Sequence, residues 1–197
     1  TLIWVLLNYE KRTRINYLVI IVSGSVINEI IYNFHKIRGE NFTINGNVFT
    51  LIHTILWLLI LAENSRFKKQ IMYCMWFFIL FWSVDFLFVA KVYDFCVNSF
   101  ILGALLYLVL FIYQSFYELK EDNLSFFQSN DYLLKAVPLL LFLGLSFVLG
   151  FKSKVLFHII IFGTTNLYQF ISYFVNIVYY TLINVYIFKE KKSLKHV

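Results

Sequence analysis

The strongest constraint on this chain is a series of apolar runs, most of them close to 20 residues long, that recur along its length. A helix needs about 20 apolar residues to cross the hydrocarbon core of a bilayer. Seven segments can be marked, at residues 1–9, 15–34, 47–62, 71–90, 98–117, 133–150 and 155–188. Their residues do not alternate apolar and polar, as they would in a transmembrane barrel. The pattern predicts an all-α, polytopic membrane helix bundle of about seven transmembrane helices.

Composition supports the same class of protein. Of the 197 residues, 60% are hydrophobic and 14% are charged, whereas a soluble domain is nearer half apolar and a quarter charged. The formal net charge of +6 comes from Lys and Arg residues in short loops and in the tail. Such residues set topology and contact anionic lipid, so we expect no nucleic-acid partner. We expect one transmembrane domain over residues 1–197, with an incomplete first span and a basic cytoplasmic tail at 189–197.

The distribution of basic residues predicts the orientation. With seven spans, twelve Lys and Arg residues fall on one side of the membrane and five on the other. The richer side includes the tail, and the positive-inside rule assigns it to the cytoplasm. The N-terminus is then expected outside, and the membrane is expected to be the inner (cytoplasmic) membrane.

The last hydrophobic segment carries a polar seam. At 100° per residue, its Asn, Gln and several of its Tyr residues fall within an arc of about 80°. The seam consists of Asn166, Gln169, Tyr173, Asn176, Tyr180 and Asn184. A second seam in the segment 98–117 ends with Gln114 and Glu118. Because hydrocarbon cannot satisfy polar groups, we expect both seams to face other helices or internal water.

Ionisable residues inside the membrane are where chemistry would be sought. Glu29 lies near the outer end of the second segment, Asp85 lies at a similar depth in the fourth, and His53 shares a polar face in the third. We hypothesise an outward-facing polar pocket formed by Glu29, His53, Asp85, Asn98, Asn166 and Gln169. The alternative is that these groups only hydrogen-bond to one another and hold the helices together.

The sequence predicts no catalytic residues, no metal site and no cofactor. Glu29, His53 and Asp85 lack a metal-binding motif, and a bis-histidine haem would have to use His53 and His158. Familiar hydrolase, nucleotide-binding and kinase motifs are not present in the sequence. Cys74 and Cys96 stand about 33 Å apart if helical, which is too far for a disulfide.

Three short motifs give the chain a resemblance to a family. They are Val26-Ile27-Asn28-Glu29-Ile30-Ile31, then Tyr113-Gln114-Ser115-Phe116-Tyr117-Glu118-Leu119, and Asn176-Ile177-Val178-Tyr179-Tyr180. The layout resembles the uncharacterised small seven-helix integral membrane proteins of Bacteroidetes-type bacteria. In the family the sixth helix opens on an Asn-Pro-Phe-Trp-type sequence, where this chain has Ala136-Val137-Pro138. The resemblance implies seven spans and an inner-membrane location, and it implies no activity.

These patterns favour a non-enzymatic membrane protein. We expect a sensory or signalling module, or a subunit of a larger membrane complex, with the lipid bilayer and a protein partner or second copy as its contacts. A small-solute or ion transporter or pore is the first alternative, favoured by Glu29, Asp85 and a predicted helix break at residues 163–165. An intramembrane lipid-modifying enzyme is the second alternative.

Overall fold

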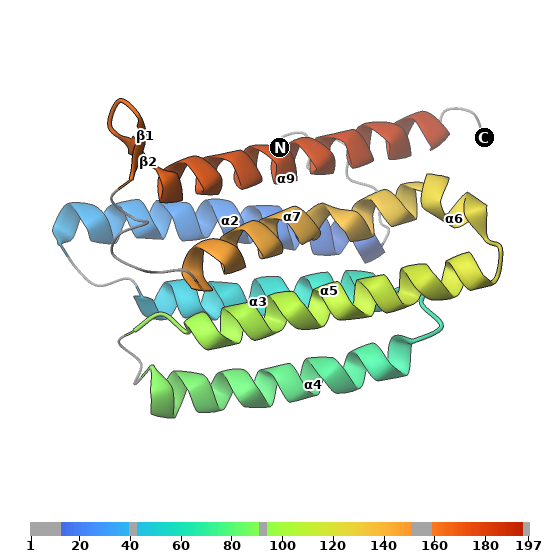
Figure 1. Cartoon of the computed structure of the whole chain (residues 1–197), viewed down its shortest axis with the longest axis horizontal. Helices are drawn as coiled ribbons and strands as arrows, with labels where there is room; N and C mark the ends of the chain where they lie inside the picture. Colours follow the sequence, from blue (N-terminus) through green and yellow to red (C-terminus); the bar gives the residue numbers. More distant parts are fainter. Residues whose placement is uncertain (1–12, 40–42, 91–93, 151–158, 195–197) are drawn as a thin grey trace. The chain divides into compact units, whose positions relative to one another are not determined.

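The computed structural model describes residues 13–39, 43–90, 94–150 and 159–194 (Figure 1). The elements are α2 (Thr13–Arg38), α3 (Thr43–Ala62), α4 (Lys68–Val84), the π-helix η1 (Asp85–Val89), α5 (Val97–Lys120), α6 (Leu124–Gln128), α7 (Asn130–Gly150), β1 (Ile160–Phe162), β2 (Thr165–Asn166) and α9 (Leu167–Leu194). The all-α architecture predicted from the apolar runs is confirmed, with one small hairpin added.

Six helices among the described residues are long and apolar enough to cross a membrane. They are Ile15–Arg38, Thr43–Ala62, Lys68–Val89, Val97–Lys120, Asn130–Gly150 and Leu167–Lys192. The chain is therefore a multi-pass membrane protein. The first predicted segment, at residues 1–9, lies outside the described residues. Most of the helices run a few residues beyond the apolar segments, because polar flanking residues continue the same backbone hydrogen bonding.

The segment 155–188 differs from the prediction of one long helix with a break. Within its described part, β1 pairs with β2 in an antiparallel hairpin, and α9 begins only at Leu167. Gly163 lies in the turn with a φ of 55°, a left-handed conformation that glycine adopts without a Cβ clash. The backbone N–H of Leu167 donates to the carbonyl of Ile159 at 2.9 Å and joins the hairpin to the helix. The predicted break at residues 163–165 is thus the turn and second strand of this hairpin.

The chain divides into two compact units, residues 1–110 and 111–197, and the boundary falls inside α5. In the first unit α2 packs on α3, and α3 packs on α4. Gly103 of α5 lies against side chains of α3 and α4. A Cβ at that position would lie 2.9 Å from a ring carbon of Phe78 and 3.0 Å from the methyl of Thr54. Glycine therefore allows α5 to approach side chains of α3 and α4 at one place.

The second unit is organised by α7 and α9, which pack along one another (Figure 1). The buried face of α9 is formed by Val175, Tyr179, Ile183, Tyr186 and Ile187. Gly144 of α7 receives Val175, and a Cβ at Gly144 would overlap the Cγ1 methyl of that valine. Because valine has a stiff χ1, its methyl group cannot easily turn away.

We expect Gly144→Ala to destabilise the protein by about 1–3 kcal/mol relative to Gly24→Ala, because it overpacks the α7–α9 contact. Gly24 is the matched control, since its added Cβ would meet a ring carbon of Phe49 at an ordinary 3.7 Å. Both variants gain the same helix propensity. Thermal unfolding in detergent, followed by circular dichroism, measures the difference. Equal midpoints for the two variants would contradict the packing description.

Candidate functional site

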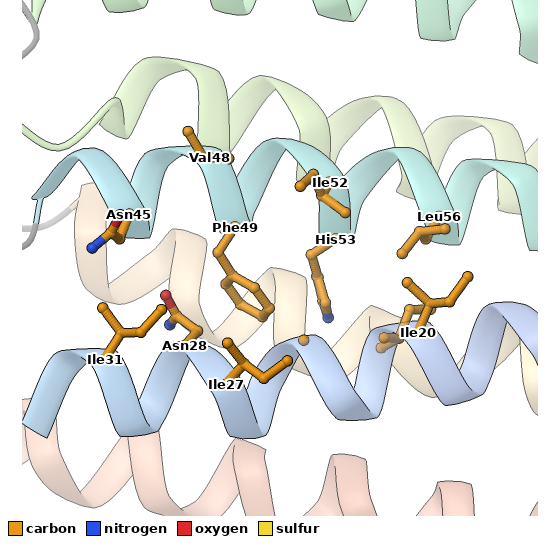
Figure 2. Close-up of a pocket in the computed structure, with 12 residues that line it drawn as sticks. Ile20, Ile27, Asn28, Ile31, Asn45, Val48, Phe49, Ile52, His53 and Leu56 are labelled. Carbon is orange, nitrogen blue, oxygen red and sulfur yellow. The ribbon is translucent and has the colours of Figure 1, made fainter.

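A pocket of about 340 Å³ lies between α2 and α3 in the first unit (Figure 2). Its size falls in the range of small-molecule sites. The lining is mostly apolar, and polar side chains occur at few positions. The residues are Ile20, Ile21, Gly24, Ile27, Asn28 and Ile31 of α2, and Asn45, Val48, Phe49, Ile52, His53 and Leu56 of α3. Both helices are candidate membrane spans, so the pocket lies in the membrane-spanning part of the chain.

His53 is the predicted pocket residue that the structure places in this lining. Its ring is buried and extends from α3 toward α2 (Figure 2). The indole N–H of Trp57 donates to Nε2 of His53 at 3.2 Å. Since an indole nitrogen can only donate, Nε2 carries no proton and the neutral ring has its proton on Nδ1. His53 therefore contributes a neutral polar group to an otherwise apolar wall.

Polar groups gather at one end of the pocket. Asn28 and Asn45 line that end, one from each helix (Figure 2). The side-chain amide of Asn45 lies 3.4 Å from Nε2 of His35, which is in the last turn of α2. Lys36 and Arg38 occupy the same turn. This end of the pocket combines amide groups with neighbouring positive charge.

Glu29 is not part of the pocket. Its side chain is on the exposed face of α2, where the amide of Asn33 donates to its carboxylate at 3.3 Å and to its backbone carbonyl at 2.9 Å. The expectation that this carboxylate turns inward is wrong for the packing of the described residues. Helix α2 is buried mainly through its first half, at positions such as Leu18 and Val22, and its second half is largely exposed.

Asp85 and Asn98 meet in a separate polar cluster. Asp85 is the first residue of η1 and is only 3% exposed. Its carboxylate accepts hydrogen bonds from the backbone N–H of Ser99 at 2.9 Å and from the Ser99 hydroxyl at 2.6 Å. The amide of Asn98 approaches at 3.4 Å. A negative charge at the first turn of α5 satisfies donors that have no partner within the helix, and it interacts favourably with the helix dipole.

Asn47 completes this cluster, and sequence reasoning missed it. It is fully buried, accepts from the backbone N–H of Cys96 at 2.9 Å and donates to the carbonyl of Asp94 at 2.9 Å. One side chain of α3 thus holds the connection that leads into α5. Asn47 lies seven residues before Thr54, on the same helix face, and that spacing was the available signal.

Asn166 and Gln169 serve a local purpose at the start of α9. The N–H of Gln169 donates to the side chain of Asn166 at 2.8 Å, and the N–H of Asn166 donates to the side chain of Gln169 at 3.2 Å. This reciprocal arrangement is a capping box, which satisfies two backbone donors at a helix start. Both residues were predicted to lie inside a helix that begins at Gly163, whereas the helix begins at Leu167.

The predicted seam on α9 is offset from the face that packs. Tyr173 is exposed, whereas Asn176, Tyr180 and Asn184 are half-buried. The packed face lies one residue earlier, through Val175, Tyr179 and Ile183. The amide of Asn176 instead donates to the carbonyl of Ser172 on its own helix at 2.8 Å. An asparagine that bonds back to its own helix does not need an interhelical partner, which is why the inward prediction was inaccurate here.

The second predicted seam lies near the end of α5. Gln114 is buried, and Glu118 is half-buried and accepts from the amide of Asn123 at 2.6 Å.

The second unit also contains a buried cation, which lies within the predicted segment 133–150. Lys135 is 1% exposed and lies 3.0 Å from the carboxylate of Asp131 and 5.8 Å from the ring centroid of Phe126. Asn130 donates to Glu190 of α9 at 2.6 Å. The predicted loop at 118–132 contains α6 and the start of α7, so these side chains belong to helices.

Within residues 13–39, 43–90, 94–150 and 159–194, no group of three or more His, Cys, Asp or Glu side chains is placed to hold a metal ion. His158, the second histidine considered for a haem, lies outside these ranges. Both cysteines are free, as their predicted separation required.

The fold and site define a multi-pass helical membrane protein with an intramembrane pocket and a capped, polar helix junction. Searches found no matching protein family, no matching curated protein and no matching solved structure. The resemblance to small seven-helix proteins of Bacteroidetes-type bacteria therefore stays a prediction.

We expect Asp85→Asn to lower the free energy of unfolding by about 2 kcal/mol, because the carboxylate that caps α5 is lost. Asp94→Asn is the matched control, since the Asp94 side chain is exposed. Chemical denaturation in mixed micelles, followed by tryptophan fluorescence, compares the two. A larger loss in Asp94→Asn would show that Asp85 does not hold the junction.

Cys96 is expected to resist alkylation in the folded protein. It is buried directly before α5, and burial raises the pKa of its thiol to about 11, with the Asp85 charge adding to the rise. The thiolate is the reactive form, so the Cys96 rate should still climb with pH above 9, where an ordinary thiol has levelled off. Maleimide labelling at pH 8 should modify Cys74 alone, and both cysteines after unfolding. Cys74→Ser and Cys96→Ser assign the two signals, and fast native labelling of Cys96 would contradict the description.

Proposed function

We propose that this chain is an inner-membrane sensory or signalling module that acts with a protein partner, or a subunit of a larger membrane complex. The observation that carries the proposal is an aromatic stripe on α4 and η1. Large apolar side chains are exposed there at helical spacing: Tyr73, Trp76, Phe77, Leu80, Val84, Leu87 and Phe88.

The spacing of the stripe suits a partner helix. Five of its positions, 73, 76, 80, 84 and 87, follow one another at intervals of three and four residues, the repeat that aligns side chains along one helix face, and Phe77 and Phe88 flank them. Tyr73 is 74% exposed and Trp76 is 63% exposed. Tyrosine and tryptophan are enriched in the contact regions of protein interfaces. A second membrane helix, from a partner or from another copy of this chain, would cover these rings and the aliphatic side chains that follow them on the same face.

The buried polar groups support a non-enzymatic role. Asp85 caps α5, Asn47 holds the connection into α5, and the capping box starts α9. These side chains are used to position helices. The pocket between α2 and α3 is then the place where a bound small molecule could change how the helices of the first unit pack.

Chemical crosslinking and recovery in mild detergent test the proposal. Native membranes should yield the chain with a partner or a second copy in fixed stoichiometry. Trp76→Ala with Phe77→Ala should lower this recovery at least tenfold, because the two rings are adjacent large aromatic side chains of the stripe and both are exposed. Ile30→Ala, at an equally exposed position on α2, is the control. A monomer without partner in the unaltered protein would overturn the proposal.

A transporter or pore is the second candidate, and one observation favours it. Asp85, a buried carboxylate, sits at the start of a π-helix, and such segments occur often at functional sites. Ion or solute flux into liposomes would distinguish the two. If the protein is a transporter, the unaltered protein carries flux, and Asp85→Asn abolishes that flux at a temperature where the variant is still folded. If the protein is a signalling module, it carries no flux.

A further inference from the structure

The pocket between α2 and α3 is elongated and polar at one end only. Its lining runs from Ile20 to Ile31 on α2, and eleven helical residues cover about 16 Å. Isoleucines form most of the α2 side, and Gly24 keeps the middle open opposite Phe49. Asn28 and Asn45 lie together at one end, and Ile20 and Leu56 lie at the other (Figure 2). A ligand that fits this shape has an apolar chain and a small polar head.

Lys36 and Arg38 share the last turn of α2 with His35, whose ring contacts Asn45 at the polar end. Arg38 lies 4.2 Å from the ring centroid of Phe34, and Lys36 lies 5.8 Å from that of Tyr32. These contacts turn both basic side chains back along α2, as helix geometry favours. Glu29, which follows Asn28 on α2, is on the exposed face and is bonded by Asn33. The polar end therefore favours an anionic head group.

We propose that this pocket binds a long-chain fatty acid anion, with the acyl chain between the two helices and the carboxylate at Asn28 and Asn45. The two amides can donate hydrogen bonds to a carboxylate, and Lys36 and Arg38 add electrostatic attraction. His53 is neutral and bonded to Trp57, so it places no charge against the chain. This inference deepens the proposed sensory function by naming the chemical class of the signal.

Fluorescence quenching by dibromostearate tests the site in the full chain, reconstituted in saturated phosphatidylcholine nanodiscs. Trp57 donates to a pocket residue and is the expected reporter, and Trp57→Phe identifies its signal. Saturable quenching is the expected result. Gly24→Leu should weaken binding at least tenfold because the added side chain fills the pocket. Val26→Leu, which introduces the same side chain on α2 outside the lining, should bind as the unaltered protein does.

The head-group requirement is tested separately. Lys36→Ala with Arg38→Ala should weaken binding of dibromostearate about fivefold or more and leave its methyl ester unaffected. If Gly24→Leu does not fold, Asn28→Leu serves as the second variant and should weaken the acid more than the ester. Equal binding of acid and ester would overturn the carboxylate assignment. Equal competition by anionic phospholipid would overturn the fatty-acid assignment and make the occupant a bilayer lipid.

Failure here and failure of the proposed function give different results. Partner recovery through the stripe on α4 is measured on the same preparation. If quenching is absent or not saturable while the partner is still recovered, the ligand proposal alone is overturned.

Discussion

The structure depends on one constraint, which is that hydrocarbon offers no hydrogen bonds to polar groups. The junction at the start of α5 shows how the chain meets it. An unpaired backbone donor at a helix start would be costly at this depth, and the buried carboxylate of Asp85 accepts from the backbone N–H of Ser99 and from its hydroxyl. Asn47 does the same for Cys96 from another helix. A charged residue and an amide inside the membrane thus serve helix ends first, and the packing of α3, α4 and α5 follows from them.

The same constraint separates structural polar groups from those able to meet a ligand. A capped helix end has its donors and acceptors already used. The pocket between α2 and α3 differs, because its asparagines are at the end of an apolar space and its centre is lined by isoleucine and a neutral histidine. In the proposed signalling role, the pocket and the stripe on α4 are both in the first unit, with α3 packed against α2 on one side and α4 on the other. In that role, a ligand that moves α2 against α3 would also change the contact between α3 and α4, because α3 packs on both helices.

Much of the fold was predictable, and the site was predictable only in part. Hydropathy located the described helices because length and apolar content are all that a bilayer requires. The single polar pocket predicted from the sequence is not one site: His53 lines the pocket between α2 and α3, whereas Asp85 and Asn98 lie in a separate cluster. Glu29 was misplaced because periodicity cannot tell which face of α2 has a neighbour. Asn166 and Gln169 were misread because a helix start cannot be recognised when the preceding strand is equally apolar, as Ile160 to Phe162 is.

The sequence by itself determined that this is a helical membrane protein, because runs of that length and polarity have no other stable state in lipid. Only the tertiary structure decided which polar residues face one another. Hydrogen bonds act over about 3 Å, and whether Asn176 turns to its own helix or Asn47 reaches the start of α5 depends on how the helices rotate against their neighbours. That rotation is set by shape, such as Val175 against Gly144, and a linear pattern does not contain it.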